Sequence, residues 1–151
     1  MGRARTASSA TPAAALLARL AELCRALPQS TAQVRGDHAD FRVRQRVYAY
    51  FLDNHHGDGI ISVCVKTRLG EHVDRVRLEP QRCYLPAYIG KRGWLGVRLD
   101  LGRVDWREVE ELVRMSYRHV APRTLVARLD SAVQPPAVRR QARGRTTGPA
   151  P

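Results

Sequence analysis

The chain has 151 residues, the length of one ordinary domain and enough to bury a hydrophobic core. Its 26 basic and 14 acidic residues give a formal net charge of +12. A positive charge of this size favours a polyanionic partner such as nucleic acid. No stretch approaches the roughly 20 apolar residues of a membrane span, and no secretory core is present, so we expect a cytoplasmic protein without membrane contact. The competing explanation of the charge is non-specific adhesion.

Charge and composition divide the chain into three segments. Residues 1–10 contain Arg3 and Arg5 and no acid, and residues 131–151 contain four arginines among Pro, Gly and Gln. We expect both segments to be disordered basic tails, because they hold few side chains to bury. Residues 11–130 carry the remaining +6, from 20 basic and 14 acidic residues, and form a single domain.

The first expected element is a helix that Thr11 caps and Pro12 opens. Leucines recur along it at helical spacing and predict one apolar face, widened by Leu17 and Cys24. Pro28 ends the helix. The leucines of this face are Leu16, Leu20, Leu23 and Leu27.

Strands are predicted in the middle of the chain, where apolar residues alternate. Residues 54–59 (NHHGDG) form a turn, residues 69–78 a short surface helix that ends before Pro80, and residues 100–103 another turn. The strands come before the first turn, after it, and over residues 94–99. Alternation places five side chains of the first strand region on one face, namely Phe41, Val43, Val47, Ala49 and Phe51, and three on the next strand, namely Ile61, Val63 and Val65.

A second long helix is expected after Asp105, which caps it, with Glu108 completing a capping box. Ala121 and Pro122 end this helix, and a further helical turn follows. The helix, strands, helix order predicts an α+β domain: an antiparallel sheet with the N-terminal and C-terminal helices packed on one face. One face of the long helix holds Trp106, Val109, Val113, Tyr117 and Val120, and the further turn holds Leu125, Val126 and Leu129.

Residues 83–122 join a glycine-bounded basic turn, a strand and a capped helix, and this order of parts resembles the MmcQ/YjbR family. The resemblance rests on Tyr84, Pro86, Tyr88, Gly90, Gly93 and Trp94 before the strand, and on Ser116 and Tyr117 within the helix. Upstream, Phe41, Val43 and residues 47–51 resemble the family's FxVxGKxFAxF strand pair, with Gln45 and Arg46 where relatives have Gly-Lys. The resemblance covers roughly residues 14–130. It implies a CyaY-like fold, a hairpin near Gln45, and double-wing DNA binding, in which two β-hairpins flank a helix.

Cations in or beside strands and turns are the candidate nucleic-acid contacts. We expect them to bind mainly the phosphates of duplex DNA, with low sequence specificity. The turn at residues 90–93 lacks the spacing of a nucleotide-binding P-loop. If the strand is regular, Arg42, Arg44 and Arg46 share one face with Tyr48 and Tyr50. The candidate set is Arg42, Arg44, Arg46, Lys66, Arg68, Lys91, Arg92 and Arg98.

The alternative function is a non-enzymatic protein-interaction adaptor. Its aromatic contact residues are Tyr84, Tyr88 and Trp94, expected as an exposed patch. A frataxin-like role in iron handling is disfavoured, because the first helix contains Glu22 as its sole acid.

Chemistry beyond binding has weak support in the sequence. His55 and His56 lie near Asp58, and His38 lies between Asp37 and Asp40, but polar turns explain both groups better than a metal site does. No nucleophile or paired-carboxylate motif is present, so we expect neither an enzyme nor a bound cofactor. Three cysteines, Cys24, Cys64 and Cys83, lie among apolar neighbours and are expected to be reduced core residues.

Overall fold

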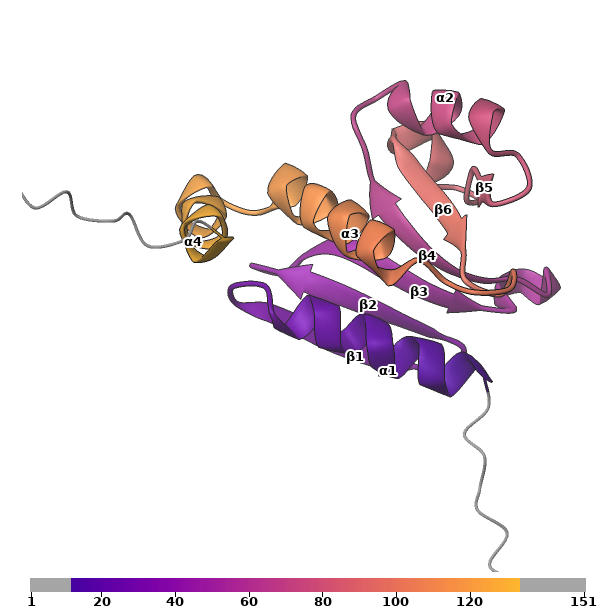
Figure 1. Cartoon of the computed structure of the whole chain (residues 1–151), viewed down its shortest axis with the longest axis horizontal. Coiled ribbons are helices and arrows are strands. Elements are labelled where there is room, and N and C mark those ends of the chain that lie inside the picture. Colours follow the sequence, from indigo (N-terminus) through magenta and orange to yellow (C-terminus); the bar gives the residue numbers. More distant parts are fainter. Residues whose placement is uncertain (1–11, 134–151) are drawn as a thin grey trace, which may run out of the picture.

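Six strands form one antiparallel sheet in the order β1-β2-β3-β4-β6-β5. The computed structural model describes residues 12–133 (Figure 1). The strands are β1 (Ser30–Arg35), β2 (His38–Val43), β3 (Arg46–Asp53), β4 (Ile61–Lys66), β5 (Cys83–Tyr84) and β6 (Trp94–Arg98). The helices are α1 (Pro12–Arg25), α2 (Glu71–Leu78), α3 (Trp106–Val120) and α4 (Arg123–Val133), with 3-10 turns η1 (His55–Gly57) and η2 (Gly90–Arg92).

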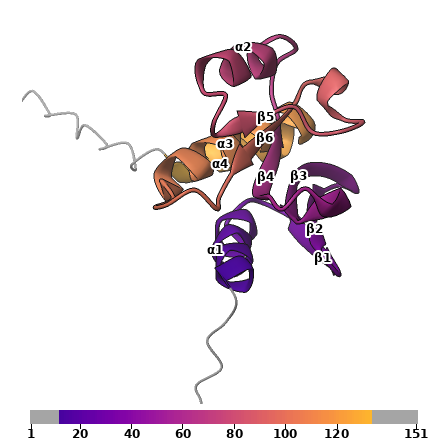
Figure 2. The ribbon, with the colours of Figure 1, turned by 90° about the vertical axis from the view of Figure 1, so that its right-hand side faces the viewer.

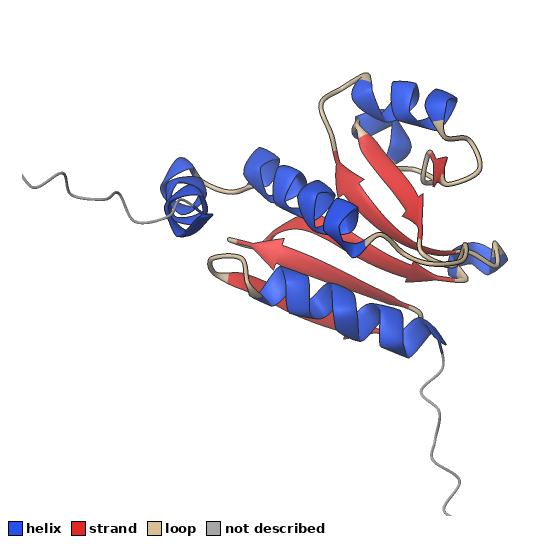
Figure 3. Cartoon of the chain, viewed as in Figure 1, coloured by secondary structure: helices blue, strands red, loops and turns tan. Residues whose placement is uncertain are grey.

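Helices α1 and α3 lie side by side on one face of this sheet, as Figure 3 shows. Figure 2, turned by 90°, shows α1 on one side of β1, β2 and β3. Leu20 of α1 and Val113 of α3 are buried in one core with Phe41 and Val63 of the sheet. The α+β prediction with helices on one face is confirmed. We call the other side of the sheet the open face. The predicted cap Thr11 lies outside the described residues.

The hairpin of β2 and β3 forms without a glycine in its turn. Arg44 and Gln45 both adopt left-handed backbone conformations, with φ of 49° and 67°, at the two positions that a tight hairpin turn requires. The hairpin predicted near Gln45 is therefore confirmed, and its two central residues carry the conformational cost that glycine avoids.

A bulge in this hairpin changes which side chains reach the core. Phe41 pairs with Ala49 and Arg42 with Val47, so Tyr48 is the extra residue of β3. Tyr48 is buried against Tyr117 of α3, with 5.4 Å between ring centroids. The prediction that Val47 shares the core face with Phe41 is wrong, because the bulge reverses the alternation at that point.

Ser116 of α3 satisfies backbone groups beside the bulge. Its hydroxyl donates to the carbonyl of Tyr48 at 2.5 Å and accepts from the backbone N–H of Lys66 at 2.8 Å. The side chain is fully buried. One serine therefore joins α3 to both β3 and β4 and leaves no buried polar group unpaired at this point.

The predicted cap of α3 is confirmed, but half of the capping box is wrong. Asp105 accepts hydrogen bonds from the backbone N–H groups of Arg107 and Glu108. The carboxylate of Glu108 instead pairs with Arg75 of α2 and with Arg82, which precedes β5. Two nearby guanidinium groups compete successfully with a single backbone donor, and the resulting ion pairs hold α2 and the start of β5 against α3.

Candidate functional site

Six of the eight predicted DNA-contacting cations lie at one end of the sheet. The turn between β2 and β3 is at this end, and the antiparallel pairing brings the end of β4 and the start of β6 to the same end. The backbone N–H of Thr67 donates to the carbonyl of Gly93 at 2.9 Å, which joins the segment after β4 to the segment before β6. We call this set the basic end: Arg44, Arg46, Lys66, Arg68, Lys91 and Arg92.

The cations of the basic end are not neutralised by acids of the described residues. Within residues 12–133, none of the six forms an ion pair with an acid. Five of the six are exposed, and Lys66 is half-buried. Arg44 has one polar contact, a hydrogen bond from its Nε to the side-chain oxygen of Gln29 at 3.0 Å. Such groups are available to phosphate oxygens.

Arg42 and Arg98, the other two predicted contacts, are each held by an acid. Arg42 makes two hydrogen bonds to Asp40, at 3.2 and 2.8 Å, and Arg98 makes two to Asp100, both at 2.9 Å. The hydrogen bond from Arg98 lowers the pKa of the Asp100 carboxyl. Both pairs are close to neutral, so these two arginines add little to the positive field.

The coherent face predicted for Arg42, Arg44, Arg46, Tyr48 and Tyr50 does not form. Arg42 and Tyr50 point to the open face, Arg44 lies in the turn, and Tyr48 is buried under the helices. The hairpin turn takes Arg44 out of the strand, and the bulge reverses the side-chain alternation at Tyr48.

The glycines around Lys91 and Arg92 are required by close packing. Gly93 has φ of 89°, and a Cβ added there would lie 3.1 Å from the carbonyl oxygen of Thr67. A Cβ at Gly90 would lie 3.2 Å from the Cβ of Leu85. The backbone of η2 is thus pressed against its neighbours on both sides, and its two cations project into solvent.

The open face carries a cavity of about 370 Å³ with a mainly apolar lining. Tyr50 and Leu52 of β3 line it together with Tyr84 and the segment from Pro86 to Ile89. The ring of Tyr84 lies over Gly96 of β6, and its hydroxyl is 2.6 Å from the hydroxyl of Ser62. Concave, apolar sites with a few polar groups are typical of ligand pockets.

The exposed aromatic patch predicted from Tyr84, Tyr88 and Trp94 is wrong in two of its three members. Trp94 is 7% exposed, and its ring centroid lies 5.1 Å from that of Tyr50. Tyr84 is half-buried, and burial raises the pKa of its hydroxyl. Tyr88 is 86% exposed. All three positions hold aromatic residues, but the sequence alone does not distinguish a ring in the core from a ring on the surface.

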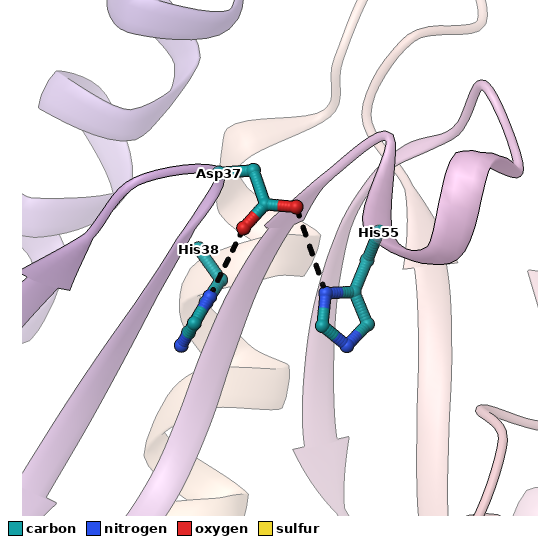
Figure 4. Close-up of side chains that lie close together, drawn as sticks. All are labelled: Asp37, His38 and His55. Atoms are coloured by element: carbon teal, nitrogen blue, oxygen red, sulfur yellow. Dashed lines mark hydrogen bonds and ion pairs between the residues drawn. The ribbon is translucent and has the colours of Figure 1, made fainter.

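Asp37, His38 and His55 come together at the opposite end of the sheet from the basic end (Figure 4). Asp37 is in the turn between β1 and β2, and His55 follows β3 in η1. The Nδ1 of His38 is 3.2 Å from Asp37 Oδ1, and the Nδ1 of His55 is 3.8 Å from Asp37 Oδ2. The sequence grouped His55 with His56 and Asp58 instead. The register of the β2–β3 hairpin, which pairs His38 with Leu52, brings His38 close to His55.

A family model described as YjbR matches residues 25–119. The chain belongs to the YjbR family. A solved structure, protein DR2400 from Deinococcus radiodurans, described as the family-model domain DUF419, has the same fold. It is 22% identical, with a TM-score of 0.59, over 76% of this chain and 87% of that one. No curated protein matches the chain.

Several residues that carry the YjbR resemblance have structural roles. Trp94 is buried, Gly93 packs against Thr67, and Ser116 bridges two strands. The hydroxyl of Tyr117 donates to the carbonyl of Pro28 at 2.6 Å, which fixes the end of α1 against α3. These contacts explain why the motif predicts the fold.

The cysteines of the YjbR domain match the expectation of reduced core residues. All three are free and buried. Burial raises the pKa of the Cys24 and Cys64 thiols to about 12, so neither is a thiolate near neutral pH.

None of the helices within residues 12–133 has the length and apolar character of a membrane span.

Proposed function

We propose that this YjbR protein is a cytoplasmic, non-enzymatic DNA-binding protein that holds duplex DNA at its basic end. The observation that carries the proposal is the set of six cations at one end of the sheet, none of which pairs with an acid within residues 12–133. Guanidinium and ammonium groups of this kind bind phosphate oxygens through charge-assisted hydrogen bonds. Each phosphate neutralised releases counterions, and binding therefore weakens as salt rises.

The distribution of acids supports one orientation on DNA. Asp37, Asp53 and Asp58 lie at the opposite end of the sheet, near the turns after β1 and β3. The first turns of α3 hold Glu108, Glu110 and Glu111, and each of these is paired with an arginine. A polyanion is attracted to the basic end and repelled from the aspartates, whereas the charges at the start of α3 largely cancel. The start of α3 is therefore not a recognition helix in this proposal, and contacts to phosphates rather than to bases give low sequence specificity.

A protein-interaction adaptor remains the second candidate, and exposed apolar side chains favour it. Tyr88 and Leu85, 86% and 46% exposed, lie on the segment that forms the cavity wall. Large exposed rings are common anchors of protein interfaces. Of the three anchors in the aromatic-patch hypothesis, Tyr84 is half-buried and Trp94 is buried, which leaves Tyr88 exposed.

A salt series on the full chain distinguishes the candidates. Lys91 and Arg92 are exposed at the basic end, whereas Arg103 and Arg107 are exposed at the other end, before and within the first turn of α3. The double variants K91A/R92A and R103A/R107A each remove two positive charges. We expect K91A/R92A to reduce the slope of log K against log salt by up to about two units, and R103A/R107A to leave it unchanged.

The comparison separates local contact from net charge. An equal loss of affinity in both double variants would mean that total charge, and not the basic end, attracts DNA. An unchanged slope in K91A/R92A would remove η2 from the interface and contradict the proposal as stated. Saturable protein capture without DNA affinity would favour the adaptor.

A further inference from the structure

We propose that Asp37, His38 and His55 form a binding site for one divalent transition-metal ion of the zinc class. The three residues offer two imidazole nitrogens and one carboxylate oxygen that lie within 4.8 Å of one another. Two of the separations, 3.2 and 3.8 Å, join the two Nδ1 atoms to the two carboxylate oxygens (Figure 4). The site lies at the opposite end of the sheet from the basic end and is independent of DNA binding.

These separations suit a shared ion. In a tetrahedral zinc site with bonds near 2.0–2.1 Å, neighbouring ligand atoms are about 3.3 Å apart. The two measured separations lie on either side of that value. The Nδ1 of His55 is buried and makes no hydrogen bond within the described chain, because 3.8 Å to Asp37 exceeds hydrogen-bond distance. A cation between the two groups would satisfy both.

The backbone holds the three ligands in place. The N–H of Asp53 donates to the carbonyl of Asp37 at 2.9 Å, which fixes the turn after β1 against the end of β3, immediately before His55. The loop that carries His55 is closed by a hydrogen bond from Gly59 N–H to the side-chain oxygen of Asn54 at 2.8 Å. The ligands therefore come from the start of β2, the turn before it and the turn after β3, and little ordering is required when the ion binds.

The donor set selects the class of ion. Imidazole nitrogens favour Zn²⁺, Co²⁺ and Ni²⁺ over Mg²⁺ and Ca²⁺, which prefer oxygen ligands. Three protein ligands leave at least one coordination position open. His38 and His55 also line the 370 Å³ cavity, so an exogenous ligand in the cavity has access to the ion.

This site differs in its chemistry from the frataxin-like iron-handling role that the acid-poor α1 disfavours. An acidic surface binds hard ions through many carboxylates. This site instead offers two imidazoles and one carboxylate beside the turn of the β1–β2 hairpin. The two histidines lie 17 positions apart in the chain and approach each other only because β2 and β3 pair, with their ring centroids 5.7 Å apart.

Zinc titration of the untagged full chain tests the site. We expect isothermal titration with Zn²⁺ to give one ion per chain, and Co²⁺ to give the visible absorption bands of a four- or five-coordinate site. H55A and D37N should each weaken Zn²⁺ binding at least about tenfold and remove the Co²⁺ bands. H119A is the matched control, because His119 is an exposed histidine in the last turn of α3.

Separate measurements distinguish a loss of folding from a loss of Zn²⁺ binding. Asp37 is exposed and His55 lies in a surface loop, so both variants should keep the wild-type circular dichroism spectrum. The rise in melting temperature caused by Zn²⁺ should vanish in folded H55A and persist in H119A. Equal Zn²⁺ affinity in the wild type and H55A, equal losses in H55A and H119A, or no binding to the wild type would each overturn the proposal.

Discussion

Gly96 in the centre of β6 sets the position of one aromatic ring. A Cβ added there would lie 2.4 Å from Cε1 of Tyr84, so only glycine lets that ring lie on the strand. The ring in turn forms a wall of the cavity on the open face, and its hydroxyl is tied to Ser62. The absence of one methyl group therefore determines the shape of a cavity built from two distant segments.

Gly96→Ala should destabilise the domain by about 1–3 kcal/mol, because the new methyl group displaces the Tyr84 ring and breaks its hydrogen bond. Urea unfolding of the single variants and of G96A/Y84A measures the coupling. In the Tyr84→Ala background the cost of G96A should largely disappear. An equal cost in both backgrounds would show that Gly96 is needed for backbone reasons alone.

Trp94→Ala should cost about 3 kcal/mol or more, since Trp94 is 7% exposed and packs on Tyr50. Trp106 is the matched control, because it is half-buried at the start of α3 and packs only at the margin of the core. Chemical denaturation should rank Trp106→Ala well below Trp94→Ala. Near-native stability of Trp94→Ala would return Trp94 to the set of surface anchors.

At the scale of elements, α3 is attached to the sheet by polar contacts as well as by its apolar face. Ser116 reaches the bulge in β3 and the end of β4, and Glu108 reaches α2 and the segment before β5. The bulge turns Tyr48 into the core, and its carbonyl finds a partner on the helix. A bulge and a helical serine thus form one device that fixes the helix over β3 and β4.

Ser116→Ala should destabilise the fold by about 1–3 kcal/mol, because two buried backbone groups lose their partner at once. Ser131, on the exposed side of α4, also donates to a backbone carbonyl and is the matched control. Thermal and urea unfolding should show little change in Ser131→Ala. A similarly small effect in both variants would mean that water replaces the Ser116 hydroxyl.

At the scale of the whole molecule, the sheet is polarised along its strands. Cations that have no acid partner in the described part of the chain gather at one end, and the histidine cluster and several acids lie at the other. The charge of +6 on residues 11–130 thus understates the field at the basic end. The expected tails lie outside the described residues, except that α4 continues past residue 130 to Val133.

A chain shortened to residues 12–133 should unfold at nearly the midpoint of the full chain, because the removed segments hold little apolar area to offset their ordering. A cut at residue 122 is the contrasting variant. It removes α4, whose Leu125 and Leu129 are buried in the core, and should lower the midpoint strongly. Calorimetry of the three chains makes the comparison. A large drop for residues 12–133 would show that a terminal segment packs on the domain.

Elements with strong local periodicity could be predicted from the sequence alone. The leucine spacing of α1, the apolar face and Asp105 cap of α3, and the alternation of β4 each arise within one segment, and local backbone geometry imposes them. The edge strand β1 escaped prediction, because five of its six side chains are exposed and its apolar residues are only the small Ala32 and Val34. It exists through backbone hydrogen bonds to β2, which no side-chain pattern records.

Which side chains meet depends on how the strands and helices pack together. The bulge sent Tyr48 inward and dispersed the predicted basic face, and strand pairing brought His38 to His55. The same pairing gathered the turns that hold Arg44, Lys66 and Lys91. The physical reason is register: a shift of one residue reverses every side chain of a strand, and register depends on packing across the whole sheet rather than on any single segment.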